Sequence, residues 1–213
     1  MSTIKTEGNC YICGKKLGKT AMKNHIMKEH AASGNEECLL LKIEGNYSKE
    51  YWIFADIPKN KTFNSLDTFL RKIWLECCGH LSDFRTIGRN IGKTRKFADF
   101  HEGDKFTHEY DMGSTTESLI TVVGDTRRPI QRSAIRLLAR NVPPAFECVI
   151  CGKPAVYICQ ECMYDLDNPY YCKECAENHE HDALLPITNS PRCGVCGYDG
   201  ALDSYVFKEQ ATD

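Results

Sequence analysis

Residues 148–196 read CVICGKPAVYICQECMYDLDNPYYCKECAENHEHDALLPITNSPRCGVC, and this stretch decides how the last third of the chain can fold. It holds eight cysteines in four Cys-x-x-Cys pairs, together with two histidines, among forty-nine residues. A Cys-x-x-Cys pair, here called a knuckle, offers two thiolates on one tight turn, which suits tetrahedral zinc. The sequence therefore predicts a zinc-built module over residues 146–200, with the knuckles Cys148/Cys151, Cys159/Cys162, Cys172/Cys175 and Cys193/Cys196 and the histidines His179 and His181.

Composition and net charge give no sign of a membrane protein or of a strongly basic nucleic-acid-binding protein. The chain has 213 residues, 42% of them apolar and 26% charged, with a formal net charge of −2, so nothing overall favours nucleic acid or membranes. The first residues contain no apolar run, and no stretch approaches the length of a membrane span. We therefore expect a cytoplasmic protein. Its thirteen cysteines would stay reduced there, which favours metal binding over disulfides.

The knuckles of the module can be paired in two ways. Sequential pairing joins Cys148/Cys151 to Cys159/Cys162 across only seven residues. Interleaved pairing joins Cys148/Cys151 to Cys172/Cys175 across twenty residues, which is within about the range usual for paired knuckles. Cys159/Cys162 then reach His179 for a second ion. We prefer the interleaved arrangement.

The fourth ligand of this second site stays open on the residues alone. His179 and His181 are separated by one residue, so in an extended chain they would point to opposite faces. Cys196, or with less support Cys193, could displace either histidine. Sites with four protein ligands are usually closed and structural, and they supply folding free energy.

The ligand order of the module, Cys-x2-Cys-x7-Cys-x2-Cys-x9-Cys-x2-Cys-x3-His-x-His, is similar to the B-box cross-brace, a two-zinc protein-interaction fold. Similar tails often carry Cys at the position of His181, whereas the position of Cys193 varies. The resemblance implies that His181 is a ligand and that Cys196 is the stronger half of the last knuckle. Residues 147–197 carry three basic groups against eight acidic ones, which favours a protein partner over nucleic acid.

A second group of candidate zinc ligands lies near the start of the chain, within residues 1–37. Its ligands are Cys10, Cys13, His25 and His30, in the order and with the histidine gap of a Cys2His2 finger. Leu17 and Met22 stand where such a finger needs a small core. We expect Thr20 to cap a helix over Ala21–His30, which would turn both histidines toward the knuckle. Residues Ala31–Glu37 are expected to be a linker.

The function of the finger is open between two readings. Five lysines could meet phosphates, so nucleic acid is a possible partner. A single finger reads only about three base pairs, too few for tight sequence-specific binding alone. A finger that contacts protein or stabilises the chain is at least as well supported. The lysines are Lys15, Lys16, Lys19, Lys23 and Lys28.

Residues 38–145 show a mixed pattern. Leu39–Glu44 and Tyr47–Ile57 are predicted strands, and Ser65 is expected to cap a helix that stops near Gly79. Cys77 and Cys78 are interpreted as small apolar residues packed in the core. The basic segment Arg85–Lys96 is interpreted as a solvated connection. Later segments predict a hairpin, from Lys105–Asp111 and Leu119–Val123, and an ambiguous helix or strand over Ile130–Asn141.

These elements predict an α+β fold with a mostly antiparallel sheet and a helix, flanked by the N-terminal Cys2His2 finger and the C-terminal two-zinc module. The motif Cys78-Gly79-His80-Leu81-x-x-Phe84 and the later run Tyr110–Glu117 resemble the Ri-plasmid open-reading-frame-three-like family, a transposon-passenger family. Leu137–Pro144 and Asn189–Tyr198 are similar to its subgroup with a cysteine-rich tail. The resemblance covers about residues 39–200 and implies an α+β fold, but the family has no established activity.

Several titratable groups of residues 38–145 could support metal or acid–base chemistry. They follow no helical His-Glu-x-x-His spacing, and no nucleophile elbow or phosphate-binding loop accompanies them. A packed or surface histidine is the better interpretation for each. Metal-assisted hydrolysis would require a cleft in which some of these groups converge, namely His80, His101, His108, Glu109, Asp111 and Glu117.

The sequence thus favours a zinc-binding, non-enzymatic protein that holds two to three zinc ions and binds a macromolecule. The acidic module suits a protein partner, and no membrane contact is expected. A nucleic-acid-associated factor that uses the finger and Arg85–Lys96 is the alternative, and a hydrolase is the second alternative. Residues 201–213 are interpreted as a tail.

Overall fold

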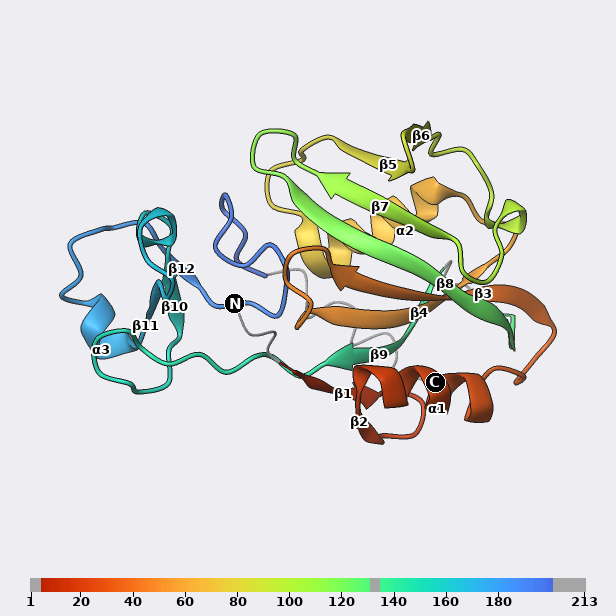
Figure 1. The fold of residues 1–213 in the computed structure, drawn as a ribbon, viewed down its shortest axis with the longest axis horizontal. Coiled ribbons are helices and arrows are strands. Elements are labelled where there is room, and N and C mark those ends of the chain that lie inside the picture. The colour runs from red at the N-terminus through yellow and green to blue at the C-terminus, as the bar shows by residue number, and fades with distance from the viewer. Residues whose placement is uncertain (1–4, 131–134, 201–213) are drawn as a thin grey trace.

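The computed structural model describes residues 5–130 and 135–200 and contains a large and a small β-sheet (Figure 1). The tail expected at residues 201–213 lies outside the described residues. The large sheet has nine strands in the order β2-β1-β9-β4-β3-β8-β7-β5-β6, and the small sheet has three in the order β11-β10-β12. The elements are β1 Glu7–Cys10, β2 Lys16–Gly18, α1 Lys19–Glu29, β3 Glu36–Gly45, β4 Trp52–Pro58, α2 Phe63–Leu70, the π-helix η1 Arg71–Leu75, β5 Ser82–Thr86, β6 Arg89–Ile91, the 3-10 helix η2 Phe97–Asp99, β7 Lys105–Tyr110, β8 Thr116–Arg128, β9 Arg136–Asn141, β10 Tyr157–Cys159, the 3-10 helix η3 Cys162–Tyr164, β11 Tyr170–Tyr171, α3 Lys173–Ala176 and β12 Leu184–Pro186.

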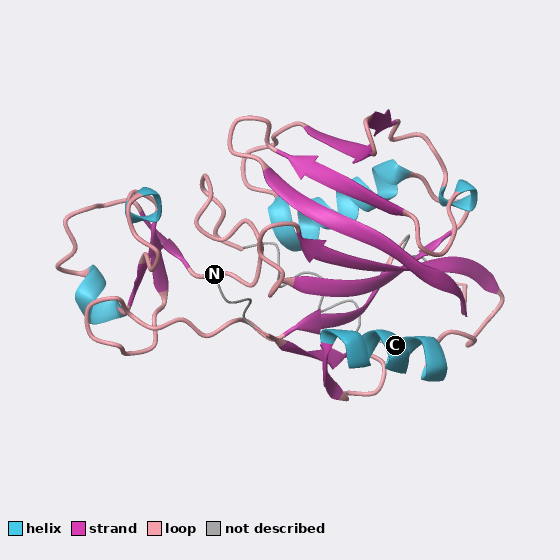
Figure 2. Ribbon diagram, viewed as in Figure 1, coloured by secondary structure: helices cyan, strands magenta, loops and turns pink. Residues whose placement is uncertain are grey.

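All paired strands of both sheets run antiparallel, and a few short helices accompany them (Figure 2). The chain therefore has the α+β fold that the sequence predicts. The edge strands β2 and β6 have only three residues each, which limits the unpaired backbone that the large sheet offers to other chains. No helix in the described part of the chain is long and apolar enough to cross a membrane.

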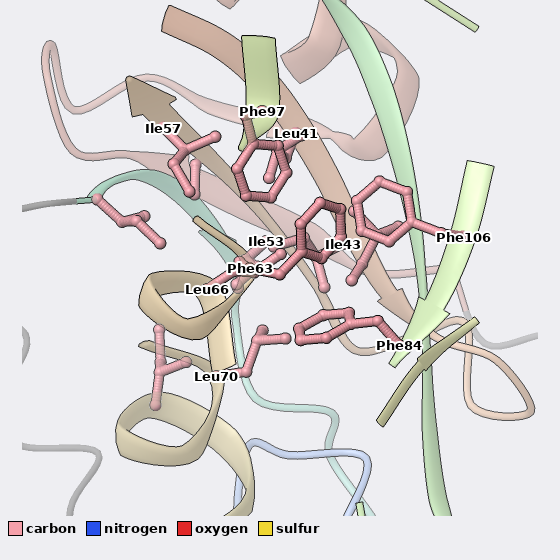
Figure 3. Packing of buried hydrophobic residues seen from close by; sticks show 14 of the residues in the cluster. Leu41, Ile43, Ile53, Ile57, Phe63, Leu66, Leu70, Phe84, Phe97 and Phe106 are labelled. Carbon is pink, nitrogen blue, oxygen red and sulfur yellow. The ribbon is translucent and has the colours of Figure 1, made fainter. Parts of the chain in front are cut away.

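One face of the large sheet is covered by α2. Alternate side chains of β3, Leu39, Leu41 and Ile43, point to this face and are fully buried. Phe63 of α2 lies at the centre of a phenylalanine cluster, with ring centroids 4.4–5.1 Å from its neighbours (Figure 3). The neighbours are Phe84, Phe97, Phe100 and Phe106.

The opposite face is covered by α1. Met22 and Ile26 of α1 join a second core cluster with Leu40, Trp52 and Phe54, whose side chains alternate with those facing α2. Both faces of β3 and β4 are thus buried, which explains the near-continuous apolar runs of these strands.

The N-terminal finger continues the large sheet. Its hairpin joins through β1, which pairs with β9 in the register Gly8↔Asn141 and Cys10↔Ala139. The amide of Val142 also donates to the carbonyl of Glu7 at 2.8 Å. Residues 1–37 and 38–145 therefore share one sheet and one α1-side core.

Helix and loop boundaries differ from the expectations in four places. The linker expected over Ala31–Glu37 is shorter, because β3 begins at Glu36. Helix α1 begins at Lys19 after an extended Gly18, so Thr20 is inside the helix and does not cap it. Helix α2 begins at Phe63 after Thr62, and its last turn widens into the π-helix η1. The basic segment Arg85–Lys96 contains the short β5–β6 hairpin, which has Gly88 at a φ of 69° in its turn.

The observed strands agree with the sequence predictions better than the helix boundaries do. The expected strands overlap β3 and β4, and the expected hairpin corresponds to β7 and β8. In the ambiguous segment the structure has a strand, β9 over Arg136–Asn141, while residues 131–134 lie outside the described residues.

A buried polar network lies beneath β5 and β7. One carboxylate oxygen of Asp67 accepts hydrogen bonds from His108 at 2.8 Å and Ser82 at 2.6 Å, and the other faces Arg71 at 3.0 Å and Lys93 at 3.1 Å. Burial alone would raise the pKa of Asp67, but the His108 and Ser82 hydrogen bonds and the nearby positive charges lower it below its usual range. Burial lowers the pKa of the His108 imidazole, because a buried site disfavours its charged form.

Replacing Asp67 by asparagine should destabilise the protein strongly. Removing one partner from a buried charged network costs about 3 kcal/mol, which for a chain of this size lowers Tm by roughly 6–12 °C. Differential scanning calorimetry at neutral pH measures the shift. The matched control is Asp125→Asn, whose carboxylate pairs with Lys59 but is 71% exposed, and Tm should change by no more than about 2 °C. Equal shifts for the two variants would contradict the role of the network.

Candidate metal centres and the adjoining groove

The described residues bring cysteine and histidine side chains together in four groups of four. Within each group every ligand atom lies within 4.8 Å of the others. With Zn–S near 2.3 Å and Zn–N near 2.0–2.1 Å, the ligand atoms of one tetrahedral ion lie roughly 3.3–3.8 Å apart. The groups are Cys10, Cys13, His25 and His30 (the finger site); Cys148, Cys151, Cys172 and Cys175 (the first module site); Cys159, Cys162, His179 and His181 (the second module site); and Cys77, Cys78, His80 and Cys196 (the junction site).

The finger site is assembled by the β1–β2 turn and α1. The amide of Gly14 donates to the carbonyl of Cys10 at 2.8 Å, and Gly14 has a φ of 76°, so the knuckle forms a tight turn. His25 lies in α1 with its Nε2 3.1 Å from Sγ of Cys13 and 3.2 Å from Nε2 of His30. Such contacts between four donors fit one shared ion.

The first module site repeats the turn of the finger knuckle. Gly152, at a φ of 70°, donates its amide to the carbonyl of Cys148 at 2.9 Å. Sγ of Cys151 lies 3.6 Å from the sulfurs of both Cys172 and Cys175, close to the spacing expected around zinc. Four thiolates with no oxygen donor favour zinc over magnesium or calcium.

The second module site lies at the end of β10. Sγ of Cys162 is 3.3 Å from Nε2 of His179 and 3.4 Å from Nδ1 of His181, and Sγ of Cys159 is 3.6 Å from the same Nδ1. The hydroxyl of Tyr171 donates to the sulfur of Cys162 at 3.3 Å, an outer-shell contact that orients the ligand.

The module ligands group as the interleaved arrangement predicts. The second module site takes Cys159 and Cys162 from the segment between the two knuckles of the first. β10, which ends at Cys159, pairs with β11 and with β12, so the strands that separate the sites also connect them. Both His179 and His181 belong to the second site, and neither Cys193 nor Cys196 is near enough to displace them.

The last knuckle does not act as a pair. Cys196 belongs to the junction site, with its sulfur 3.7 Å from that of Cys78 and 3.5 Å from Nε2 of His80. Cys193 belongs to none of the four groups; its sulfur accepts the amide of Thr188 at 3.4 Å, and burial raises the pKa of its thiol. Of the alternatives for the fourth ligand of the second module site, the structure therefore has both histidines in the group and Cys196 in the junction site.

Sequence reasoning did not place Cys77 and Cys78 in a metal group, and it named His80 only as a possible group for metal or acid–base chemistry in the central part of the chain. The prediction that Cys77 and Cys78 pack as apolar residues holds for Cys77, which is partly buried against the main core, but it is wrong for Cys78, which is exposed. Both sulfurs lie within 4.8 Å of the Cys196 sulfur. The compact run Cys77-Cys78-x-His80 was the available signal. It contains no Cys-x-x-Cys spacing, and Cys196 lies 118 residues beyond Cys78.

The histidines proposed for hydrolysis have three different settings. His108 is buried against Asp67, whereas His101 is exposed and its amide bonds the carboxylate of Asp104. His80 lies with the junction cysteines, and its Nδ1 is 3.5 Å from Oδ1 of Asp111. Glu109 pairs with Arg85, and Glu117 accepts a hydrogen bond from Asn46. Of the groups that the hydrolase alternative would bring together, His80 and Asp111 meet, whereas His101, His108, Glu109 and Glu117 have separate partners.

A groove adjoins the metal centres, between the β3–β4 turn and the module. Its cavity volume is about 410 Å³. The β3–β4 turn contributes Glu50 and Tyr51 to the lining, and η3 with the loop after it contributes apolar and acidic side chains. Tyr164 is 90% exposed and Leu166 is 44% exposed. The residues of η3 and the following loop that line the groove are Met163, Tyr164, Asp165, Leu166 and Asp167.

No family model matches the chain, and no curated protein matches it. One solved structure, a protein of unknown function from Methanosarcina mazei Go1, is similar at 16% sequence identity with a TM-score of 0.44. The match covers 49% of this chain and 69% of that one.

The Gly152 turn should control metal affinity at the first module site. Alanine there meets no atom within 4 Å, so its cost is the positive φ alone, about 1–2 kcal/mol. Gly152→Ala should therefore release one zinc ion per chain at a roughly tenfold lower concentration of a chromogenic chelator. Gly92→Ala, also without a neighbour within 4 Å but without positive φ, is the control and should leave the titration unchanged.

Proposed function

We propose that this protein is a zinc-stabilised, non-enzymatic scaffold that binds a protein segment in the groove between the β3–β4 turn and the module. The observation that carries the proposal is the alternation of exposed apolar side chains with carboxylates from the end of η3 into the following loop. Tyr164 and Leu166 alternate with Asp165 and Asp167 beside the groove. Aromatic side chains at the centre of an interface contribute much of the binding free energy.

The charge of the module indicates what the partner segment carries. Residues 147–197 contain eight acidic groups against three basic ones. A segment with lysine or arginine between apolar residues would complement both the carboxylates and the exposed rings. Polyanionic nucleic acid would be repelled from the same surface.

The ligand sets of the metal centres support a structural role for zinc. Each group offers four protein donors, which completes a tetrahedral ion and leaves no position for a substrate or activated water. The module has few apolar residues in its own core, where Cys159, Cys162, Tyr171 and Ala176 form the buried cluster. Zinc binding would supply the folding free energy that this small core lacks.

The nucleic-acid alternative has weaker support. Three of the five finger lysines face carboxylates: Lys16 at 3.3 Å from Glu7, Lys19 at 2.6 Å from Glu44, and Lys28 at 3.5 Å from Glu29. Arg85, Lys93 and Arg95 of the basic segment also have acidic partners. These pairs reduce the positive potential that the finger and the hairpin present to phosphates.

The resemblance to the Ri-plasmid open-reading-frame-three-like family remains a proposal. Its support is the motif of residues 78–84, the run Tyr110–Glu117 and the tail Asn189–Tyr198. We likewise propose that the module is a cross-brace. The support is its ligand order and the interleaved grouping of its cysteines and histidines. Neither resemblance names a partner.

Peptide binding tests the proposed function. The full chain, loaded with zinc, is titrated by fluorescence anisotropy with labelled twelve-residue peptides that alternate lysine or arginine with leucine. We expect micromolar binding that Tyr164→Ala weakens tenfold or more, because an interface aromatic contributes about 1–2 kcal/mol or more. Ile87→Ala in the β5–β6 turn, where the side chain is 99% exposed, is the control and should bind as the parent does. Equal binding by both variants, or none by the parent, would reject the groove.

A mobility-shift experiment separates the two partner classes. We expect no salt-dependent shift of the full chain with random double-stranded DNA or single-stranded RNA in about 50 mM salt. A shift that disappears when Lys15 and Lys23 are both changed to glutamine would support the nucleic-acid alternative and contradict the protein-partner proposal.

A further inference from the structure

We propose that Cys77, Cys78, His80 and Cys196 bind a fourth zinc ion, which fastens the end of the cysteine-rich module to the large sheet. Two thiols and the imidazole follow η1 in the central part of the chain, and the remaining thiol comes from the last described residues. This site goes beyond the three centres that serve the finger and the module, and it raises the metal content to four ions per chain.

The distances fit a single tetrahedral ion. The sulfurs of Cys78 and Cys196 are 3.7 Å apart, and the sulfur of Cys196 is 3.5 Å from Nε2 of His80. Both values fall in the 3.3–3.8 Å range expected around zinc, and they match those of the two module sites. Three thiolates and one imidazole are a usual structural zinc set.

His80 has the outer-shell partner that zinc-binding histidines usually have. It turns Nε2 toward the sulfurs, and its Nδ1 lies 3.5 Å from Oδ1 of Asp111. A carboxylate behind the ring fixes the tautomer and makes the metal-facing nitrogen a better ligand. Asp111 is itself held by the amide of Gly113 at 3.0 Å and by Arg192 at 2.7 Å.

Arg192 supplies the charge that this ligand set requires. Three thiolates on Zn²⁺ leave a net charge of −1, which a positive charge beside the ligands offsets. The guanidinium of Arg192 is fully buried, and its Nη2 lies 3.5 Å from the sulfur of Cys77 and 2.7 Å from the Asp111 carboxylate. It also lies 4.8 Å from the centre of the Tyr110 ring.

The backbone around the site adopts rare conformations. Asp111 and Cys196 are the non-glycine residues with positive φ in the described part of the chain, at 66° and 55°, and Gly79 between the ligands has a φ of 74°. The π-helix η1 ends at Leu75, two residues before Cys77. Strained φ values and π-turns concentrate at functional sites, where surrounding contacts hold them.

A zinc ion here would connect parts of the chain that are far apart in sequence. The segment before Cys196 already contacts the large sheet, because Ser190 donates to the carbonyl of Trp74 at 2.6 Å and Asn189 pairs with Asn141. On the module side, the amide group of Gln160 donates to the carbonyls of Gly194 and Cys196 at 3.1 and 2.6 Å. The junction site thus lies between the two sheets. A zinc ion there would hold in place the segment before Cys196, which lines part of the groove.

Elemental analysis of the full chain, purified from zinc-supplemented medium without chelator, tests the site. We expect four zinc ions per chain, and three after Cys78→Ser or Cys196→Ser. Cys193→Ser is the matched control, because Cys193 is three residues from Cys196 but outside the ligand group, and it should keep four. The double variant His181→Ala/Cys196→Ser should keep two zinc ions, since His181 and Cys196 would bind different ions.

Two outcomes would overturn the proposal. A parent chain that holds three ions, with no loss on Cys196→Ser, would show that the junction thiols bind no metal. Loss of the same single ion from His181→Ala, Cys196→Ser and the double variant would place Cys196 in the second module site.

A conservative variant separates ligation from simple misfolding. His80→Cys retains four donors and should hold four ions, whereas His80→Ala should hold three. Hydrogen exchange should then show loss of protection at residues 188–196 in His80→Ala alone, with residues 148–181 unchanged. Equal metal content in the two variants would contradict a ligand role for His80.

Discussion

Burial of β3 and β4 on both faces is the constraint on which the rest of the structure depends. All seven residues of β4 are buried, and alternate side chains of β3 enter two different cores. A sheet that is apolar on both faces must be covered twice, and the chain does this with α2 on one face and the finger helix α1 on the other. The finger is consequently a structural part of the large sheet, which fits a stabilising role and leaves less of α1 free to enter a DNA groove.

Residues 189–196 pack against the large sheet. This contact connects parts of the chain that are far apart in sequence. Arg192 is fully buried between Asp111, the Tyr110 ring and Cys77, and Ser190 bonds the carbonyl of Trp74. Leaving any of these groups without its partner would carry the desolvation cost of a buried charge or polar group. The module is therefore held beside the β3–β4 turn, and the groove proposed for a peptide exists because of this placement.

Most of the fold and three of the four ligand groups could be predicted from local patterns. Alternation marked β4 and β7, short apolar runs marked β3 and β8, and fixed spacing marked the knuckles, because these signals act within a few residues. Capping was predicted less well: Thr20 and Ser65 have the chemistry of helix caps, but tertiary packing starts the helices at Lys19 and Phe63. The β5–β6 hairpin was missed because its strands are short and strongly charged.

The sequence by itself predicted the α+β fold and the finger group, and it favoured the interleaved pairing of the module, since a knuckle places two sulfurs on one turn wherever it occurs. It left the fourth ligand of the second module site open. Only the tertiary structure decided where Cys196 belongs and that Cys77, Cys78 and His80 join it. The physical reason is distance along the chain. Spacing constrains ligands on one turn, whereas bringing Cys196 to Cys78 across 118 residues depends on the buried contacts of Ser190 and Arg192.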